Sequence, residues 1–153
     1  MREVTTRLIN DFKIYELGFD FMGYKVDKKS SLDFHHLIVG KKNCQVVGLG
    51  DGYQYENGCI LNHNTSHPYL HLIECKDYQK FCYISSEMID MKIKRKLDLY
   101  NLKRIQEILL EFEEENKYAK TKKGKLLIKP EFLRRVNLWK YILIMNLWIG
   151  MII

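Results

Sequence analysis

The five histidines of this 153-residue chain all fall between positions 35 and 71. They are His35, His36, His63, His67 and His71. Neutral imidazole is the commonest metal ligand among protein side chains. Because His67 and His71 are four positions apart, a helix would point both rings to one side, where they can bind one ion. The cluster predicts a metal site whose third ligand comes from another segment.

One residue of the adjacent pair His35 and His36 can supply the third metal ligand, and the other can face the substrate. Successive residues of a strand face opposite ways, so a slight bend lets one ring bind metal while its neighbour faces a substrate. An imidazole with a pKa of about 6.5 can take a proton from water at neutral pH. A cation stabilises a charged phosphate and a departing oxygen. The alternative is that these are surface or hydrogen-bonded core histidines that bind no metal.

The order His35-His36, then Asn57, then His67-x-x-x-His71 resembles the HNH, or His-Me finger, nucleases. The double histidine is most similar to that of the colicin-type DNases. The similar segment runs from about Leu32 to Glu74. The resemblance implies a ββα-metal core, in which a β-hairpin and a helix hold one divalent ion.

The resemblance also implies a role for each motif residue. His35, His67 and His71 would be the metal ligands, with Mg²⁺, Mn²⁺, Ni²⁺ or Zn²⁺ as the ion. His36 would be the general base. Asn57 would orient that base through its side-chain amide, and Asn62 is the alternative for this position. His63 matches no motif position and is expected to be exposed to solvent.

The charge of the chain points to the same kind of substrate. The formal net charge is +6 and the isoelectric point is about 9.0. Such a field attracts polyanions, which include nucleic acids and anionic membranes. Lys41 and Lys42, just after the double histidine, can contact backbone phosphates or lie in a solvated turn. We therefore expect nucleic acid, DNA in particular, as the partner, with a membrane as the alternative.

The local patterns predict the elements that must position these residues. Residues 1–31 are expected to be a lead-in segment, with short strands or irregular structure at 8–26 and a polar turn at 27–31. Residues 32–39 suit a strand, and Asp51-Gly52 favours a hairpin turn between strands at 45–47 and 53–55. A helix should begin near His67 or Pro68, because proline is tolerated in a first helical turn.

The second half of the chain has the spacing of helices. Residues 77–95 and 98–118 are predicted helices, the second behind a cap at Asp98, within a helical and basic extension covering 76–135. The apolar tail, 136–153, is expected to form a helix packed on the domain or on a partner. A membrane anchor or a translated stretch without function are the alternatives.

Together these patterns predict an α+β protein with a ββα-metal core at residues 32–75 and additional C-terminal helices. Its expected function is that of a metal-dependent HNH-type endonuclease, a hydrolase of phosphodiester bonds. A non-catalytic nucleic-acid-binding protein with a structural metal finger, or a membrane-associated accessory protein, are the alternatives. The four cysteines form no CxxC pair and no secretion signal precedes them, so we expect reduced thiols and a cytoplasmic location.

Overall fold

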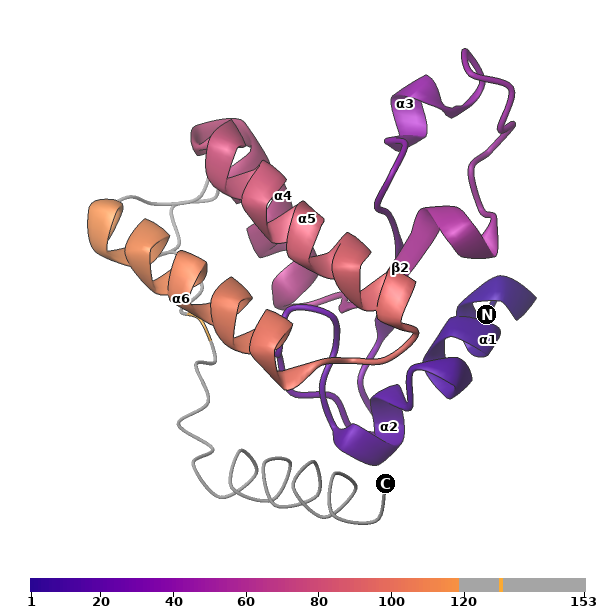
Figure 1. Cartoon of the computed structure of the whole chain (residues 1–153), viewed down its shortest axis with the longest axis horizontal. Helices are drawn as coiled ribbons and strands as arrows, with labels where there is room; N and C mark the ends of the chain where they lie inside the picture. The colour runs from indigo at the N-terminus through magenta and orange to yellow at the C-terminus, as the bar shows by residue number, and fades with distance from the viewer. Residues whose placement is uncertain (119–129, 131–153) are drawn as a thin grey trace.

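The computed structural model describes residues 1–118 and residue 130, and this part of the chain has an α+β fold (Figure 1). Its elements, in chain order, are α1 (Glu3–Asp11), α2 (Ile14–Leu17), β1 (Leu32–His36), α3 (Lys41–Cys44), the 3-10 helix η1 (Tyr55–Asn57), β2 (Gly58–Asn62), α4 (Ser66–Lys76), α5 (Tyr78–Lys94) and α6 (Leu99–Glu115). The apolar segment 136–153 and most of the basic segment before it lie outside the described residues.

Strands β1 and β2 form an antiparallel pair whose register runs from Leu32 opposite Asn62 to His36 opposite Gly58. β2 is buried along its whole length and contacts both α1 and α4. Gly58 allows close packing at the end of the pair, because a Cβ at this position would lie 2.0 Å from the Phe34 ring. The hairpin is therefore the central layer of the fold.

Helices α4, α5 and α6 follow one another: α4 contacts β2, and α5 packs against both α4 and α6 (Figure 1). Asp77 is the single residue between α4 and α5, and its side chain accepts the backbone N–H of Lys80 at 3.2 Å. Asp98 caps α6 by accepting the N–H of Tyr100 at 2.9 Å. The predicted helices at 77–95 and 98–118 are thus confirmed, with ends shifted by a few residues. The apolar face predicted for the second helix is buried: Leu102, Ile105, Ile108, Leu109 and Phe112.

The prediction of short strands or irregular structure at 8–26 is wrong for residues 8–11 and 14–17, which belong to α1 and α2. Residues 3–11 and 14–17 are helical. The reason is the spacing of Thr5, Leu8, Ile9 and Phe12, which share one helical face and are all buried. The polar turn at 27–31 is confirmed, since the N–H of Ser30 bonds the carbonyl of Asp27 at 3.0 Å.

The hairpin predicted at 45–47 and 53–55 is also wrong. The described hairpin is β1–β2, and residues 37–57 form its long connection, which carries α3 and extends away from the helices (Figure 1). Val46 and Val47 are exposed and pair with no strand. Gly52 does adopt the expected positive φ, 78°, but within this loop. None of the helices in the described part of the chain has the length and hydrophobicity needed to cross a bilayer.

A buried carboxylate, Asp20, links the lead-in to the end of the hairpin. Its Oδ1 accepts the backbone N–H groups of Met22 at 2.9 Å and Tyr24 at 3.0 Å. Its Oδ2 accepts the N–H of Asn62 at 2.9 Å and the hydroxyl of Ser66. One side chain therefore bonds both the last residue of β2 and the first residue of α4.

This carboxylate should make the stability of the protein depend on pH. Burial raises the pKa of Asp20 from 3.8 to about 6, because its hydrogen bonds offset only part of the desolvation. A raised folded-state pKa means that its contribution to stability is full below the unfolded value and declines as pH rises through about 6. Relative to Asp20→Asn, the wild-type free energy of unfolding should fall by about 2 kcal/mol from about pH 4 to about pH 7.

Urea unfolding of the two proteins across this range measures the difference. Asp27→Asn is a suitable control, because backbone hydrogen bonding by Lys29 lowers the pKa of this exposed carboxyl. Relative to that variant, the wild type should lose stability as pH falls. Parallel pH profiles for the wild type and Asp20→Asn would contradict the assignment.

Candidate metal centre

Three histidines from two elements converge at one point. His35 comes from β1, while His67 and His71 come from α4. Their ligand nitrogens all lie within 4.8 Å of one another. Among the described residues, this is the one cluster of potential metal-binding side chains. The sequence-predicted ligands are therefore brought together by the fold.

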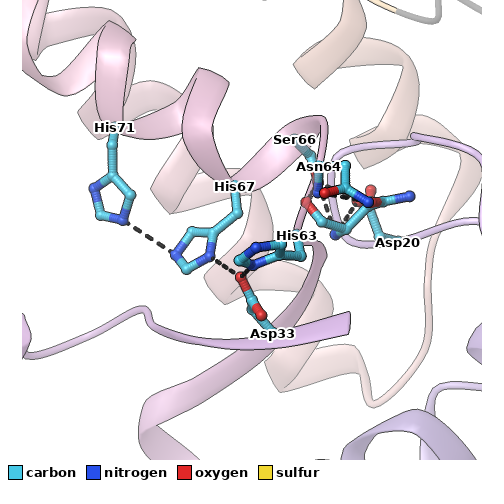
Figure 2. Close-up of polar contacts among 8 residues, drawn as sticks. Asp20, Asp33, His63, Asn64, Ser66, His67 and His71 are labelled. Carbon is cyan, nitrogen blue, oxygen red and sulfur yellow. Dashed lines mark hydrogen bonds and ion pairs between the residues drawn. The ribbon is translucent and has the colours of Figure 1, made fainter. Parts of the chain in front are cut away.

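Helix α4 presents its two rings together because both positions are helical. The helix begins at Ser66, so His67 and His71 are one turn apart and Pro68 lies in the first turn. Their Nε2 atoms are 3.1 Å apart (Figure 2). Zinc–nitrogen bonds of about 2.0–2.1 Å place neighbouring ligands of a tetrahedral site roughly 3.3 Å apart. The two rings therefore have the spacing of ligands that share an ion.

His35 supplies an independent indication that the site fits a cation. Its side chain is almost entirely buried, with 4% of the residue exposed, and its Nε2 has no hydrogen-bond partner among the described residues. Burial is the main reason that the pKa of His35 falls to about 3. The ring is therefore neutral at neutral pH, and an unpaired buried nitrogen is costly. A metal ion at the meeting point of the three rings would satisfy it.

His36 is held in a different environment from His35. Its Nε2 lies 2.8 Å from the carbonyl oxygen of Asp51, and its ring packs edge-on against Phe34 and Tyr53. Because a carbonyl can only accept, Nε2 donates its hydrogen and the neutral ring carries its lone pair on Nδ1. That nitrogen can accept a proton, as a general base must.

Glycine at position 52 makes room for this ring. A Cβ there would lie 2.7 Å from Cδ2 of His36 and 2.3 Å from Sγ of Cys44. The positive φ of Gly52 is also one that other residues rarely adopt. The Asp51-Gly52 pair, interpreted from sequence as a hairpin turn, thus positions the His36 ring.

The side chain of Asn57 hydrogen-bonds the backbone of the long loop, residues 37–57, at several points and makes no hydrogen bond to the His36 ring. Its buried side chain accepts the N–H groups of Ile38 and Val39 at 3.2 and 2.7 Å, and donates to the carbonyls of Val39 and Gly52 at 3.0 and 3.1 Å. The resemblance implied direct orientation of His36 by this amide. In the structure the link is indirect: Asn57 bonds the carbonyl of Gly52, and the carbonyl of the preceding residue, Asp51, bonds His36.

The alternative asparagine, Asn62, lies at the far end of the hairpin from His36. Its side chain donates to the carbonyl of Lys25 at 3.0 Å and accepts the N–H of Asn64 at 3.0 Å. Geometry therefore favours Asn57 over Asn62 as the asparagine that shapes the loop around His36.

An open groove of about 1000 Å³ connects the two parts of the site. The three clustered histidines and His36 all line it, so one bound ligand can reach both. Its other walls include Lys41 and Lys42 of α3 and several exposed apolar side chains: Ile38, Val46, Val47 and Tyr78.

Three further residues around the cluster were not predicted from the sequence. Asp33 bonds Nδ1 of His67 at 2.7 Å, and His63 bonds the same carboxylate. Glu74 lies 3.3 Å from Nδ1 of His71. Two of these carried a usable signal: Asp33 shares a strand face with His35, and Glu74 is one helical turn after His71. His63 carried none, because its position depends on how the strands pair.

Comparisons of the chain with protein-family models, with curated proteins and with solved structures found no match.

The convergence of the rings predicts metal binding that depends on α4. Removing His67 and His71 together eliminates two of three ligands, so the dissociation constant for Zn²⁺ should rise at least about 100-fold in His67→Ala/His71→Ala. Competition with a chromophoric chelator measures the constant. The matched control is Gln79→Ala/Tyr83→Ala, an exposed pair with the same spacing on α5. Unchanged affinity in the histidine double variant would refute the ligand assignment.

Proposed function

We propose that this protein is a metal-dependent endonuclease of the HNH type, which hydrolyses phosphodiester bonds in nucleic acid, with DNA as the expected substrate. In this proposal β1, β2 and α4 constitute the ββα-metal core. The observation that supports it best is the convergence of His35, His67 and His71 beside a fourth ring, His36, in one groove. The site thus has both a place for a cation and a separate base.

A divalent ion held by the three histidines would stabilise the negative charge that develops on the phosphate and on the leaving oxygen. His36 accepts a proton from the attacking water at Nδ1, while its Nε2–H remains bonded to Asp51. The water oxygen forms a bond to phosphorus as the bond to the leaving oxygen breaks, and that oxygen then takes up a proton from solvent. The nearly complete burial of His35 keeps that ring neutral and available as a ligand.

The groove also offers charges for the rest of a polyanionic substrate. Lys41 and Lys42 are exposed and line the groove that contains the histidines. Ammonium groups in this position can contact phosphates on either side of the reacting one without reading sequence. This placement supports nucleic acid as the substrate class.

The role of His36 is tested by plasmid nicking. His36→Ala should lower the rate at least about 100-fold, because a general base acts in the chemical step. Its affinity for metal should stay that of the wild type, since His36 is outside the ligand cluster. Supercoiled plasmid is incubated with protein and Mg²⁺, Mn²⁺, Ni²⁺ or Zn²⁺ in turn, with Gln79→Ala/Tyr83→Ala as the unaffected control.

Two outcomes of this assay would contradict the proposal in different ways. Full activity in His36→Ala would reject His36 as the base. A wild-type protein that binds metal and plasmid but cleaves with none of the four ions would reject the nuclease and support the non-catalytic nucleic-acid-binding alternative.

The lysine pair gives a separate test of the substrate path. Lys41→Glu/Lys42→Glu should raise KM for plasmid at least about 10-fold and weaken its dependence on salt, while kcat changes little. The matched control is Lys28→Glu/Lys29→Glu, another exposed adjacent pair, because it changes the net charge equally. Equal effects of the two variants would mean that the overall charge, and not the groove, attracts the substrate.

A further inference from the structure

Behind the histidine cluster, one carboxylate oxygen serves two imidazoles. Oδ2 of Asp33 lies 2.7 Å from Nδ1 of His67 and 2.7 Å from Nδ1 of His63. Figure 2 shows the resulting row, which runs from His71 through His67 and Asp33 to His63. Because a carboxylate only accepts hydrogen bonds, both rings donate their Nδ1–H to it.

The first of these bonds determines which nitrogen of His67 can bind a metal. With its hydrogen on Nδ1, the neutral ring carries its lone pair on Nε2. That atom faces Nε2 of His71 at 3.1 Å. Such a bond from a carboxylate also holds the ring plane and raises the basicity of the ligand nitrogen.

The strand pairing explains why Asp33 and His63 meet. Asp33 and His35 are alternate residues of β1, so they lie on the same face, toward α4. The N–H of His63 bonds the carbonyl of Ser31 at 2.9 Å, which continues the β1–β2 pairing one step past Asn62. This backbone bond places His63 beside Asp33, although its own side chain is 59% exposed.

We propose that Asp33 and His63 are positioning residues of the metal centre: Asp33 orients the ligand His67, and His63 holds the Asp33 carboxylate in place. This inference rests on the metal site of the proposed function and adds residues that the nuclease motif does not include in this chain. Loss of such an outer hydrogen bond typically weakens metal affinity 10- to 100-fold.

The chain contains a natural comparison for Asp33. Glu74 stands in the corresponding place behind His71, but its oxygen is 3.3 Å from Nδ1 and its side chain is 40% exposed. Asp33 makes a shorter bond and is 28% exposed. A shorter, less solvated hydrogen bond contributes more, so substitution of Asp33 should weaken metal binding more than substitution of Glu74.

The test measures Zn²⁺ affinity of the full chain by chelator competition for Asp33→Ala, Asp33→Asn, His63→Gln and Glu74→Gln. Asp33→Ala should bind about 10- to 100-fold more weakly than the wild type. The Zn²⁺ affinity of Asp33→Asn should lie between those of Asp33→Ala and the wild type, because an amide oxygen accepts a hydrogen bond more weakly than a carboxylate oxygen. His63→Gln should raise the dissociation constant for Zn²⁺ about 2- to 5-fold, and Glu74→Gln should raise it no more than about 5-fold. Wild-type affinity in His63→Gln would remove His63 from the proposal. Thermal unfolding of each variant identifies any that fail to fold. If Asp33→Ala does not fold, Asp33→Asn and His63→Gln test the proposed contacts of Asp33.

A second readout needs no metal. Nitrogen-15 chemical shifts of the His67 ring should report a hydrogen on Nδ1 in the wild type and a mixture of tautomers in Asp33→Ala. Wild-type affinity in both Asp33 variants, or a hydrogen on Nε2 of His67 in the wild type, would overturn this inference while leaving the proposed nuclease intact. Failure of the wild type itself to bind Zn²⁺, Mn²⁺, Ni²⁺ or Mg²⁺ would instead overturn the metal site and with it the proposed function.

Discussion

The buried carboxylate of Asp20 determines where β2 ends and α4 begins. It accepts the N–H of Asn62 and the hydroxyl of Ser66, and its other oxygen bonds two backbone N–H groups of the lead-in. Because Ser66 is the first residue of α4, its bond to Asp20 helps to set the phase of the helix, that is, the direction in which each side chain of α4 points. The phase in turn decides that His67 and His71 face β1, where His35 lies. Burial of a carboxylate is unfavourable unless its oxygens are bonded, and here each oxygen accepts two hydrogen bonds.

A second set of bonds holds the other half of the site. Asn57 connects the backbone at Val39 and Gly52, which brings the two sides of the long loop together. The loop then supplies the Asp51 carbonyl that bonds His36. Consecutive residues of one strand thus enter different environments: His35 is buried in the cluster with α4, and His36 packs among aromatic rings beside the loop. In the proposed nuclease, this separation would let one segment offer both a metal ligand and a general base.

Some of the buried polar side chains lie in the candidate site or in the segments that hold it. Asp20, Asn57 and His35 are all buried, and the first two have their hydrogen bonds satisfied within the protein. His35 has an unpaired Nε2, and among the described residues Thr65, Tyr69, Ser85 and Gln106 each have a buried side-chain oxygen that is likewise without a hydrogen-bond partner. A folded protein tolerates few such groups, since each costs free energy of the order of a lost hydrogen bond. The unpaired nitrogen of His35 belongs to one of the three imidazoles that meet, as expected if binding an ion compensates for its cost.

Local spacing in the sequence was sufficient to predict α5 and α6 and to single out the three histidines that converge, but the helices α1 and α2 were missed. The period of apolar residues predicted α5 and α6, and the i, i+4 pair with the double histidine selected the residues that converge. The partner of β1, the path of residues 37–57, and the contact of His63 with Asp33 depended on tertiary structure. These features follow from strand register and buried hydrogen bonds between segments far apart in the chain, such as the pairing of Asp33 with Leu61. Short-range patterns carry no record of such contacts, because the same residues could satisfy their hydrogen bonds in many other arrangements.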